Sequence, residues 1–336
     1  MTPSGEALQE PMLDAIEEEL QHIAGALESE PHAEMGRMIA YHFGWREHTE
    51  AGIQGKRIRP LFTLLVCHAA GGNWQDSIAA AASIELIHNF SLIHDDIEDN
   101  SLRRRGRPTM WNKWTMPQAL NTGDALLILS QTAPHRLASS GIPADRILAV
   151  LRCLDRACLQ LTIGQHLDLD FETREKVSTD EYMTMIGGKT SSLISAATEV
   201  GAMLAGAESD RVQAFADFGW HLGLAFQVQD DILGIWGEPA ITGKPAGDDL
   251  IARKKTLPVL HGLQHSENFR MLWRQQAAKV QELRAALEAA GADEHARTVA
   301  EDHTKQALRS LQSARPEGPA ATELKLITKN LLTRPS

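Results

Sequence analysis

Two pairs of aspartates, far apart in the chain, have a type and spacing that suit metal chemistry. Asp95 and Asp99 lie in the segment HDDIEDN, and Asp230 and Asp231 lie in FQVQDDILG. Residues four apart on a helix lie one turn apart on the same face, so Asp95 and Asp99 present their carboxylates together. Mg²⁺ takes oxygen ligands and usually also meets substrate phosphates. We therefore predict a magnesium site at each pair; for the first pair the alternative is a solvated acidic end of a helix.

Basic residues accompany both acidic pairs. Arg103, Arg104 and Arg105 come directly after the first pair, the segment GKPAGDDLIARKKTLPV follows the second, and GKRIRP at 55–60 is an upstream basic turn. Arginine suits bidentate binding of diphosphate, although arginines that merely pair with the aspartates are the alternative. The later lysines form either a flap over a bound diphosphate or a solvated loop. Two acidic pairs with two basic sets predict two diphosphate substrates.

Helices are expected to position these residues. Apolar side chains recur at three- and four-residue steps in almost every long segment, and no alternating strand run or βαβ pattern occurs. Because no polar linker divides the chain, we predict a single all-α domain over residues 1–336. The expected helices cover 13–27, 61–70, 77–99, 117–139, 143–170, 179–205, 209–236, 256–263, 267–291, 293–313 and 322–333.

The composition limits the class of protein. The chain has 336 residues, 43% of them apolar and 23% charged, and its net charge of −11 argues against nucleic acid or an anionic membrane as the main partner. Its three cysteines, Cys67, Cys153 and Cys158, show no CxxC spacing, which favours a reduced cytoplasmic protein. We expect no secretory signal, because the acidic N-terminal segment has no basic region followed by an apolar one. We also expect no stable membrane anchor, because no run of about 18 uncharged apolar residues occurs.

A series of motifs over roughly residues 50–260 resembles the trans-prenyl diphosphate synthase family. These are GKRIRP at 55–60, DDIED at 95–99 with RRGRPT at 104–109, GDALL at 123–127, GQHLDL at 164–169, GGKTSSL at 187–193, FQVQDD at 226–231 and GKPAGDDL at 243–250. The resemblance implies an antiparallel helical bundle around a central cavity, the isoprenoid synthase type of fold, and a homodimer. The implied activity is head-to-tail condensation of isopentenyl diphosphate with an allylic diphosphate.

The resemblance also implies roles for individual residues. Asp95 and Asp99 correspond to the ligands of two Mg²⁺ ions, and Asp230 to the ligand of a third. The pocket for isopentenyl diphosphate corresponds to Lys56, Arg59, His88 and Arg105. The cations around the allylic diphosphate correspond to Arg104, Lys189, Lys244 and Lys254. Thr190 and Gln227 correspond to oxygens that steady the allylic cation, and Gln165 and Asp168 to groups between the two acidic helices.

The implied reaction begins with ionisation of the allylic diphosphate. Mg²⁺ and the cationic side chains neutralise the leaving diphosphate, and the double bond of isopentenyl diphosphate attacks the resulting cation. No side-chain base is evident, so the released diphosphate is the expected base. For His88 the alternative is an ordinary histidine on an apolar helix, but its place two turns before Asp95 favours the binding role.

Three positions depart from the family pattern. Gly234 stands where many members carry the last aspartate of the second motif, Arg253 where a glycine often precedes the lysine, and Gln54 where a glycine often precedes Gly55. Two aspartates remain in the second motif, enough for one metal ion. The change at Arg253 could alter how the predicted flap closes.

The residues four and five before the first aspartate often limit product length in this family. Here they are Ser91 and Phe90. This pattern favours a 20-carbon geranylgeranyl product, with the 15-carbon farnesyl product next; the alternative is that Phe90 belongs to the ordinary core.

Two other functions remain open. In a class I terpene cyclase, Asp230, Gly234 and Glu238 would have the spacing of the metal triad, but Gly234 has no side-chain ligand and the basic motifs are superfluous for one substrate. A non-catalytic subunit that regulates another prenyl synthase is the second alternative. Both acidic pairs and all basic motifs are present, which favours the synthase.

Overall fold

The computed structural model describes residues 6–27, 29–45, 55–238, 247–275 and 277–332. Lys244, assigned above to the allylic diphosphate, lies outside the described residues, as does Gln54. Within the described part, the chain is helical apart from its connections and one two-stranded hairpin, which confirms the predicted all-α class. No helix in this part is long and apolar enough to cross a membrane.

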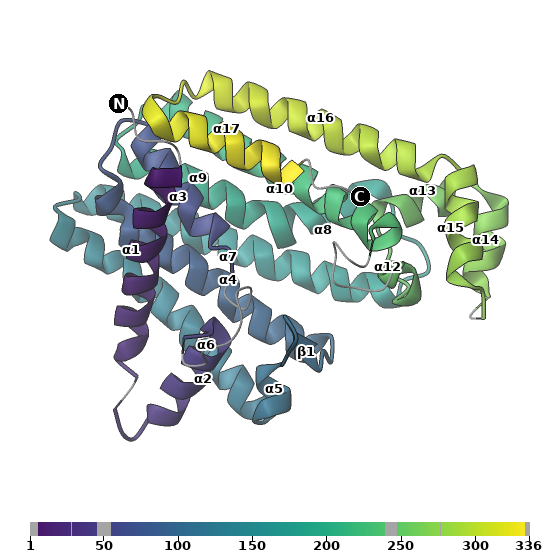
Figure 1. Ribbon diagram of the computed structural model, residues 1–336, viewed down its shortest axis with the longest axis horizontal. Coiled ribbons are helices and arrows are strands. Elements are labelled where there is room, and N and C mark those ends of the chain that lie inside the picture. Colours follow the sequence, from purple (N-terminus) through teal and green to yellow (C-terminus); the bar gives the residue numbers. More distant parts are fainter. Residues whose placement is uncertain (1–5, 28, 46–54, 239–246, 276, 333–336) are drawn as a thin grey trace. The chain divides into compact units, whose positions relative to one another are not determined.

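The elements follow one another in the order shown in Figure 1. The first part contains α1 (Glu6–Gly25), α2 (Ala33–Phe43), α3 (Ile58–Ala69), the 3₁₀ turn η1 (Trp74–Ser77), α4 (Ile78–Glu98), β1 (Arg103–Arg104), β2 (Arg107–Pro108), α5 (Met110–Lys113), α6 (Met116–Thr132) and the 3₁₀ segment η2 (Ala133–Ser140). The middle contains α7 (Ala144–Thr173), α8 (Thr179–Ile186), the π-helical turn η3 (Gly187–Ser191), α9 (Ser192–Leu204) and α10 (Ser209–Trp236). The last part contains α12 (Asp248–Ile251), α13 (Leu257–His265), α14 (Glu267–Arg274), α15 (Val280–Ala289), α16 (Ala292–Ser313) and α17 (Gly318–Leu332).

Three helices that were predicted as continuous are interrupted. Helix 117–139 changes to a 3₁₀ segment after Thr132, where Pro134 lacks a backbone N–H for the α-helical pattern. Helix 179–205 contains the π-helical turn η3, and helix 267–291 ends at Arg274 and begins again at Val280. The sequence prediction missed the 11-residue helix α2, the four-residue helices α5 and α12, and the hairpin β1–β2.

The chain divides into two compact units. The first comprises residues 1–156, 197–212 and 316–324, and the second comprises 157–196, 213–315 and 325–336. The predicted single domain around a central cavity stays a prediction.

Helix α4 is the central element of the first unit. Helices α1, α3, α5 and α6 pack against it, and α6 runs beside it (Figure 1). Its apolar side chains are buried along most of its length; among them are Ile84, Leu86, Ile87 and Ile93. The acidic segment that begins at Asp95 is therefore the end of a core helix, held in place by packing on several sides.

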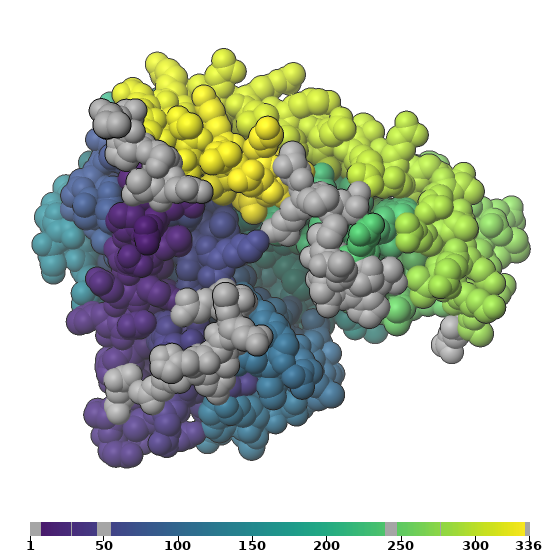
Figure 2. Space-filling view, viewed as in Figure 1, coloured from purple at the N-terminus to yellow at the C-terminus, as the bar shows by residue number. Residues whose placement is uncertain are grey.

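The second unit has two clusters of buried apolar side chains. One joins α8, α10, α13 and α16 through Tyr182, Val228, Ile232 and Leu260, among others. The other joins α10, α12, α14 and α15 around Phe269. In the space-filling view, α15 and α16 form a continuous outer surface of this unit (Figure 2). The clusters fix the positions of α8, α10 and α12, which carry the second set of predicted site residues.

Candidate active site

Asp95 of the first acidic pair and its neighbour Asp96 contact an arginine of the hairpin β1–β2. Arg104 donates from Nη2 to Oδ2 of Asp95 at 3.1 Å and from Nε to Oδ1 of Asp96 at 2.8 Å. Burial raises the pKa of Asp96 to about 6, although Arg104 acts in the opposite direction. The structure thus shows the carboxylate pairing that was the alternative for the arginines, and places one guanidinium beside a predicted metal ligand. Asp99 is exposed, one turn beyond Asp95.

The hairpin turns back because of its backbone conformation. Arg105 (φ 49°) and Gly106 (φ 76°) both adopt left-handed conformations. The indole of Trp111 donates to the backbone oxygens of Asp96 (2.8 Å) and Ser101 (3.0 Å), which ties the following helix to the end of α4. Arg104 therefore reaches the aspartates from a fixed strand rather than from a free loop.

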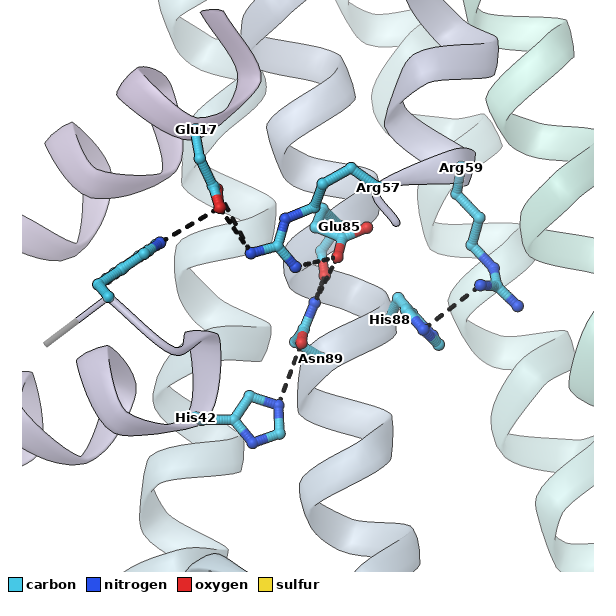
Figure 3. A network of polar contacts seen from close by, with 8 residues as sticks. Glu17, His42, Arg57, Arg59, Glu85, His88 and Asn89 are labelled. Carbon is cyan, nitrogen blue, oxygen red and sulfur yellow. Dashed lines mark hydrogen bonds and ion pairs between the residues drawn. The ribbon is translucent and has the colours of Figure 1, made fainter. Parts of the chain in front are cut away.

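The upstream basic turn divides into structural and exposed cations. Arg57 is buried and donates to Glu85 of α4 at 2.9 Å and to Glu17 of α1 at 2.8 Å (Figure 3). Its neighbour Lys56 is exposed. Asn89 joins the same network, donating to Glu85 Oε1 at 3.0 Å. Arg57 thus fixes the turn, and Lys56 remains the side chain of this pair that is open to a substrate.

Arg59 and His88 lie together, as the resemblance implied for the isopentenyl diphosphate pocket. Nη1 of Arg59 lies 3.3 Å from Nε2 of His88 (Figure 3). Burial and the nearby arginines lower the pKa of His88 well below its ordinary value, so the imidazole is neutral and can accept from Arg59. The guanidinium of Arg105 lies against Gly55, where an added Cβ would be 3.2 Å from its nitrogens. The structure brings these three predicted residues and Gly55 into one part of the first unit.

Helices α8 and α10 and the segment before α13 enclose a cavity of about 220 Å³ in the second unit. Its lining includes most of the residues predicted around the second acidic pair. These are Asp168, Lys189, Thr190, Gln227, Asp230, Asp231 and Lys254, together with Tyr182, Asp249 and Lys255. Carboxylates, ammonium groups and neutral oxygens therefore share one small space.

The two adjacent aspartates of the second pair have different environments. Asp230 is exposed, whereas Asp231 is 5% exposed and accepts hydrogen bonds from Tyr182 Oη (2.6 Å) and from the backbone N–H of Leu257 (3.0 Å). Burial raises the pKa of Asp231 to about 7, against the opposing effect of these donors. Asp230 is thus available to a ligand, and Asp231 is a structural anchor.

The anchor also orients Gln227. The Nε2 of Gln227 donates to Asp231 Oδ1 at 3.3 Å, and the Oε1 of Gln227 accepts from the hydroxyl of Thr190 at 2.8 Å. An amide that donates at one end and accepts at the other has a defined orientation. Sequence reasoning missed the role of Tyr182, since nothing local to this residue reveals a partner 49 positions away.

The π-helical turn places Lys189 next to α7. Lys189 forms an ion pair with Asp168. The backbones approach so closely that a Cβ on Gly164 would lie 2.2 Å from the amide nitrogen of Lys189, and one on Gly188 would lie 2.6 Å from the carbonyl oxygen of Gln160. Only glycine, which has no side chain, therefore fits at these positions of the motifs GQHLDL and GGKTSSL, where the two backbones are in contact. The wider turn after Ile186 brings Lys189 and Thr190 to the cavity.

The basic segment before α13 is fixed at several points. Arg253 has φ 55°, in the region that glycine adopts readily. Its guanidinium donates to the carbonyl oxygens of Trp273 and Gln275, each at 2.7 Å. Lys255 donates to the carbonyl oxygen of Phe171. The departure at Arg253 is therefore compensated locally, and Lys254 between these two residues lines the cavity.

The predicted chain-length residues occupy α4. Phe90 is 6% exposed and packs edge-on against His94, with ring centroids 5.7 Å apart. The hydroxyl of Ser91 donates to the carbonyl oxygen of His88 at 2.8 Å. Both environments suit core residues, and the influence of these residues on product length stays a prediction.

The donors present suit a hard divalent cation. Among the described residues, no three His, Cys, Asp or Glu side chains converge as a preformed metal site. Mg²⁺ does not require one, because it is commonly held by one or two carboxylates plus phosphate oxygens. Asp95 and Asp99 in the first unit and Asp230 in the second supply such carboxylates, beside Arg104 and the lysines of the cavity.

Comparison with known proteins identifies a family. A family model described as polyprenyl synthetase matches residues 47–290. The chain is 43% identical over 239 residues to a (2E,6E)-farnesyl diphosphate synthase of Mycobacterium tuberculosis, a match that covers 70% of this chain and 65% of that protein. It thus spans less than two thirds of that relative's length. It is 38% identical over 293 residues to a geranylgeranyl diphosphate synthase of the same species, covering 83% of this chain and 82% of the relative.

Solved structures share the fold over nearly the whole chain. A polyprenyl synthetase from Streptomyces coelicolor has a TM-score of 0.87 and 31% identity, covering 98% of this chain and 99% of the other. A geranylgeranyl pyrophosphate synthase from Corynebacterium glutamicum, complexed with isoprenyl diphosphate and magnesium, has a TM-score of 0.83 and 25% identity, covering 97% and 99%.

Proposed function

Because the chain belongs to the polyprenyl synthetase family, as the sequence motifs predicted, we propose that it is a prenyltransferase that condenses isopentenyl diphosphate with an allylic diphosphate. The observation that carries this proposal is the cavity of the second unit. There an exposed carboxylate, Asp230, shares the space with Lys189 and Lys254 and with the hydrogen-bonded pair Thr190–Gln227. These are the groups that a leaving diphosphate and a developing allylic cation require.

The residues of this cavity divide the work. Lys189 and Lys254 bind the diphosphate of the allylic substrate, a role that we also propose for Arg104. When bound, Mg²⁺ at Asp95, Asp99 and Asp230 supplies positive charge that favours loss of diphosphate. The oxygens of Thr190 and Gln227 stabilise the allylic cation, and the anchor Asp231 holds the amide of Gln227 in its orientation. We propose three such ions.

The second substrate binds to the basic residues of the first unit. Lys56, Arg59 and Arg105 contact the diphosphate of isopentenyl diphosphate, and neutral His88 positions Arg59. Two diphosphate sites distinguish this protein from a terpene cyclase, which needs one. The product is a short-chain prenyl diphosphate, and Phe90 favours the 20-carbon product over the 15-carbon one. We also propose that the protein is cytoplasmic and a homodimer; light scattering of the purified protein tests the homodimer.

Incubation of the purified protein with Mg²⁺, isopentenyl diphosphate and each of three starters tests the function. The starters are dimethylallyl, geranyl and farnesyl diphosphate, and the products are separated by chain length. Elongation that ends at 20 carbons is expected. Hydrocarbon or alcohol released without isopentenyl diphosphate would identify a cyclase. No product from any starter, with turnover appearing only after another synthase is added, would identify a regulatory subunit.

A further inference from the structure

The second unit contains a further pocket, larger than the cavity of the candidate active site. Its volume is about 810 Å³, and it is lined by the connection from α7 to α8, by α13 and by α14. Helix α13 packs against both α8 and α14, which holds these walls together. Among the described residues, Lys255 is the one that lines both this pocket and the candidate active site. Pockets of roughly 300–1,000 Å³ hold small organic molecules, so this one has the size of a separate ligand site.

The lining of this pocket is mainly positive in charge. Five basic side chains contribute to it, and we call it the basic pocket after them: Arg174, Lys176, Lys255, Arg270 and Arg274. The acidic side chains of the lining are Glu175 and Asp180. The basic pocket therefore has an excess of positive charge in a chain whose net charge is −11. Such a local reversal of sign, in a concave site, concentrates anions.

Two of the arginines are held in place by contacts that leave donors for a ligand. Arg174 donates from Nη2 to the carboxylate of Glu181 at 2.6 Å and from Nη1 to that of Asp170 at 3.5 Å. Arg270 donates from Nη1 to two carbonyl oxygens at the end of α13, at 3.1 and 3.2 Å. A guanidinium has five N–H donors, so both side chains are oriented by the protein and can still bind an anion.

Lys255 is held close to these arginines although their charges are alike. Its Nζ donates to the carbonyl oxygens of Phe171 and Glu172 near the end of α7. Burial lowers the pKa of Lys255, and the positive charge of Arg174 acts in the same direction, against the opposing effect of the Glu172 carboxylate. Because separate contacts fix the two cations, their repulsion persists in the empty pocket. An anion bound beside both would offset it.

Apolar side chains also line the basic pocket. Val177 and Leu263 lie on the outside of the cluster that joins α8, α10, α13 and α16, and Trp273 lies on the outside of the cluster around Phe269. All three are only partly buried, so they leave apolar surface in the pocket. A ligand that covers this surface gains from its removal from water. The pocket thus offers cations for one end of a ligand and apolar surface for the other.

We propose that the basic pocket binds an organic phosphate, with its phosphate or diphosphate on the basic side chains and its apolar body on Val177, Leu263 and Trp273. An inorganic anion would leave the apolar surface in water, and an uncharged lipid would leave the cations without a counter-charge. Two kinds of molecule have this chemistry: an alkyl or prenyl phosphate, and a nucleotide whose base stacks on the indole. The site does not depend on the proposed function, because its ligand is bound rather than converted.

Isothermal titration calorimetry with n-octyl phosphate as the probe tests the proposal. The background variant Lys189→Ala/Lys254→Ala weakens phosphate binding in the cavity of the candidate active site, so that the signal reports the basic pocket. In this background, Lys176→Ala/Arg274→Ala is expected to raise the Kd for octyl phosphate at least tenfold. Both residues are exposed, so their removal leaves the apolar clusters intact, and thermal unfolding verifies this.

The matched control removes the same charges from another surface of the second unit. Lys305 and Arg309 are exposed on α16 and do not line the basic pocket. Lys305→Ala/Arg309→Ala, in the same background, should change the Kd less than twofold. Equal losses in the two double variants would show that only the net charge of the protein matters, and would overturn the site.

Two further probes test the apolar part and the kind of ligand. Inorganic phosphate should bind at least tenfold more weakly than octyl phosphate, because it has no apolar body; equal affinities would overturn the proposed role of Val177, Leu263 and Trp273. ADP that binds more tightly than octyl phosphate, and loses affinity in Lys176→Ala/Arg274→Ala, would identify a nucleotide site. Weaker binding of ADP would identify a site for alkyl or prenyl phosphates. Each result holds whether or not the parent elongates prenyl chains, so failure of one proposal is distinguishable from failure of the other.

Discussion

The hydroxyl of Tyr182 donates a 2.6 Å hydrogen bond to Oδ2 of Asp231 inside the second unit. Through this bond α8 holds the second aspartate of an acidic pair, and the backbone of Leu257 holds the same oxygen from the start of α13. Asp231 in turn accepts from Gln227. One buried carboxylate thus joins three helices and sets the orientation of an amide predicted to contact the allylic cation.

Tyr182→Phe is therefore expected to impair both stability and turnover. Loss of a hydrogen bond to a buried carboxylate typically costs about 1–3 kcal/mol of unfolding free energy. The kcat should fall more than the KM for either substrate, because the change alters the orientation of Gln227 rather than a diphosphate contact. Urea unfolding and steady-state kinetics measure the two effects.

The protein offers a matched control. Tyr41 is its only other tyrosine, and its hydroxyl donates to the carbonyl oxygen of Pro108 in an exposed hydrogen bond. Tyr41→Phe should change the free energy of unfolding by less than about 0.5 kcal/mol. Equal losses in the two variants would contradict the assignment of Asp231 as an anchor.

Stability should depend on pH through Asp231. Its pKa is about 7 in the folded protein and its ordinary value is 3.8, so between these values the folded state holds a proton that the unfolded state has released. The free energy of unfolding contributed by this group is then fully present below about pH 4 and is lost as pH rises towards 7. Asp231→Asn has no such proton. The stability of the parent relative to this variant should therefore decrease from pH 4 to 7 in urea unfolding; parallel curves would be inconsistent with a raised pKa.

Phe90→Ala is expected to lengthen the product. If Phe90 closes the space into which the chain grows, its removal admits at least one further five-carbon unit. Phe→Ala in a core also typically costs about 3–5 kcal/mol, so Phe90→Leu serves as a milder variant. Phe62→Leu, at a buried position of α3, controls for a general loss of packing. Chromatography of the products decides: unchanged length in both Phe90 variants would place the stop elsewhere.

Arg104→Ala should weaken binding of the allylic substrate. This guanidinium contacts both Asp95 and Asp96, and its removal takes a cation from beside a predicted metal ligand. We expect the KM for the allylic diphosphate and the Mg²⁺ concentration for half-maximal rate to rise at least tenfold. Arg104→Lys should recover only part of the loss, because a lysine cannot make both contacts.

Arg103→Ala is the control for the change at Arg104. Arg103 is exposed and donates to the backbone oxygen of Gly106, so both kinetic constants should stay within twofold of the parent. Similar effects at the two positions would mean that the hairpin's overall charge, rather than the specific contact of Arg104, matters.

Substitution of Arg57 should affect stability, whereas substitution of its neighbour Lys56 should affect substrate binding. Arg57→Ala leaves the buried carboxylate of Glu85 without its cationic partner, which typically costs about 3–5 kcal/mol. Lys56→Ala should leave the unfolding free energy unchanged and raise the KM for isopentenyl diphosphate. Denaturant unfolding beside substrate titration tests both expectations. A stability loss at Lys56, or none at Arg57, would reverse the assignment.

The sequence predicted the helices and the local motifs well, for a physical reason. Helical periodicity and the i, i+4 spacing of Asp95 and Asp99 depend on residues close together in the chain. The local pattern of residue types alone could not separate neighbours whose roles depend on distant partners, although the family resemblance assigned roles to Lys56 and Asp230 and none to Arg57 and Asp231. Arg57 and Lys56 look alike in GKRIRP, and Asp230 and Asp231 look alike in FQVQDD, until Glu17, Glu85 and Tyr182 are in place.

The departures from the family pattern show the same limit. Gly234 looked like a lost ligand, but the carboxylate of Asp249 occupies its space. Arg253 looked like an altered flap, but Trp273 and Gln275 hold it in the conformation that a glycine would adopt. In both cases the contacting group comes from another part of the chain, and no local pattern could reveal it.

The ion pair between Arg57 and Glu17 makes α1 a support of the proposed isopentenyl diphosphate site. Glu17 belongs to α1, which carries no predicted site residue, yet its carboxylate holds the turn that presents Lys56 and Arg59. A shortened form that starts after Glu17, whether made by proteolysis or by choice of an expression boundary, therefore carries a defect in this turn although every motif residue is intact. Such a form should bind isopentenyl diphosphate poorly, and this loss of binding would be mistaken for the effect of a mutation in the basic motif itself.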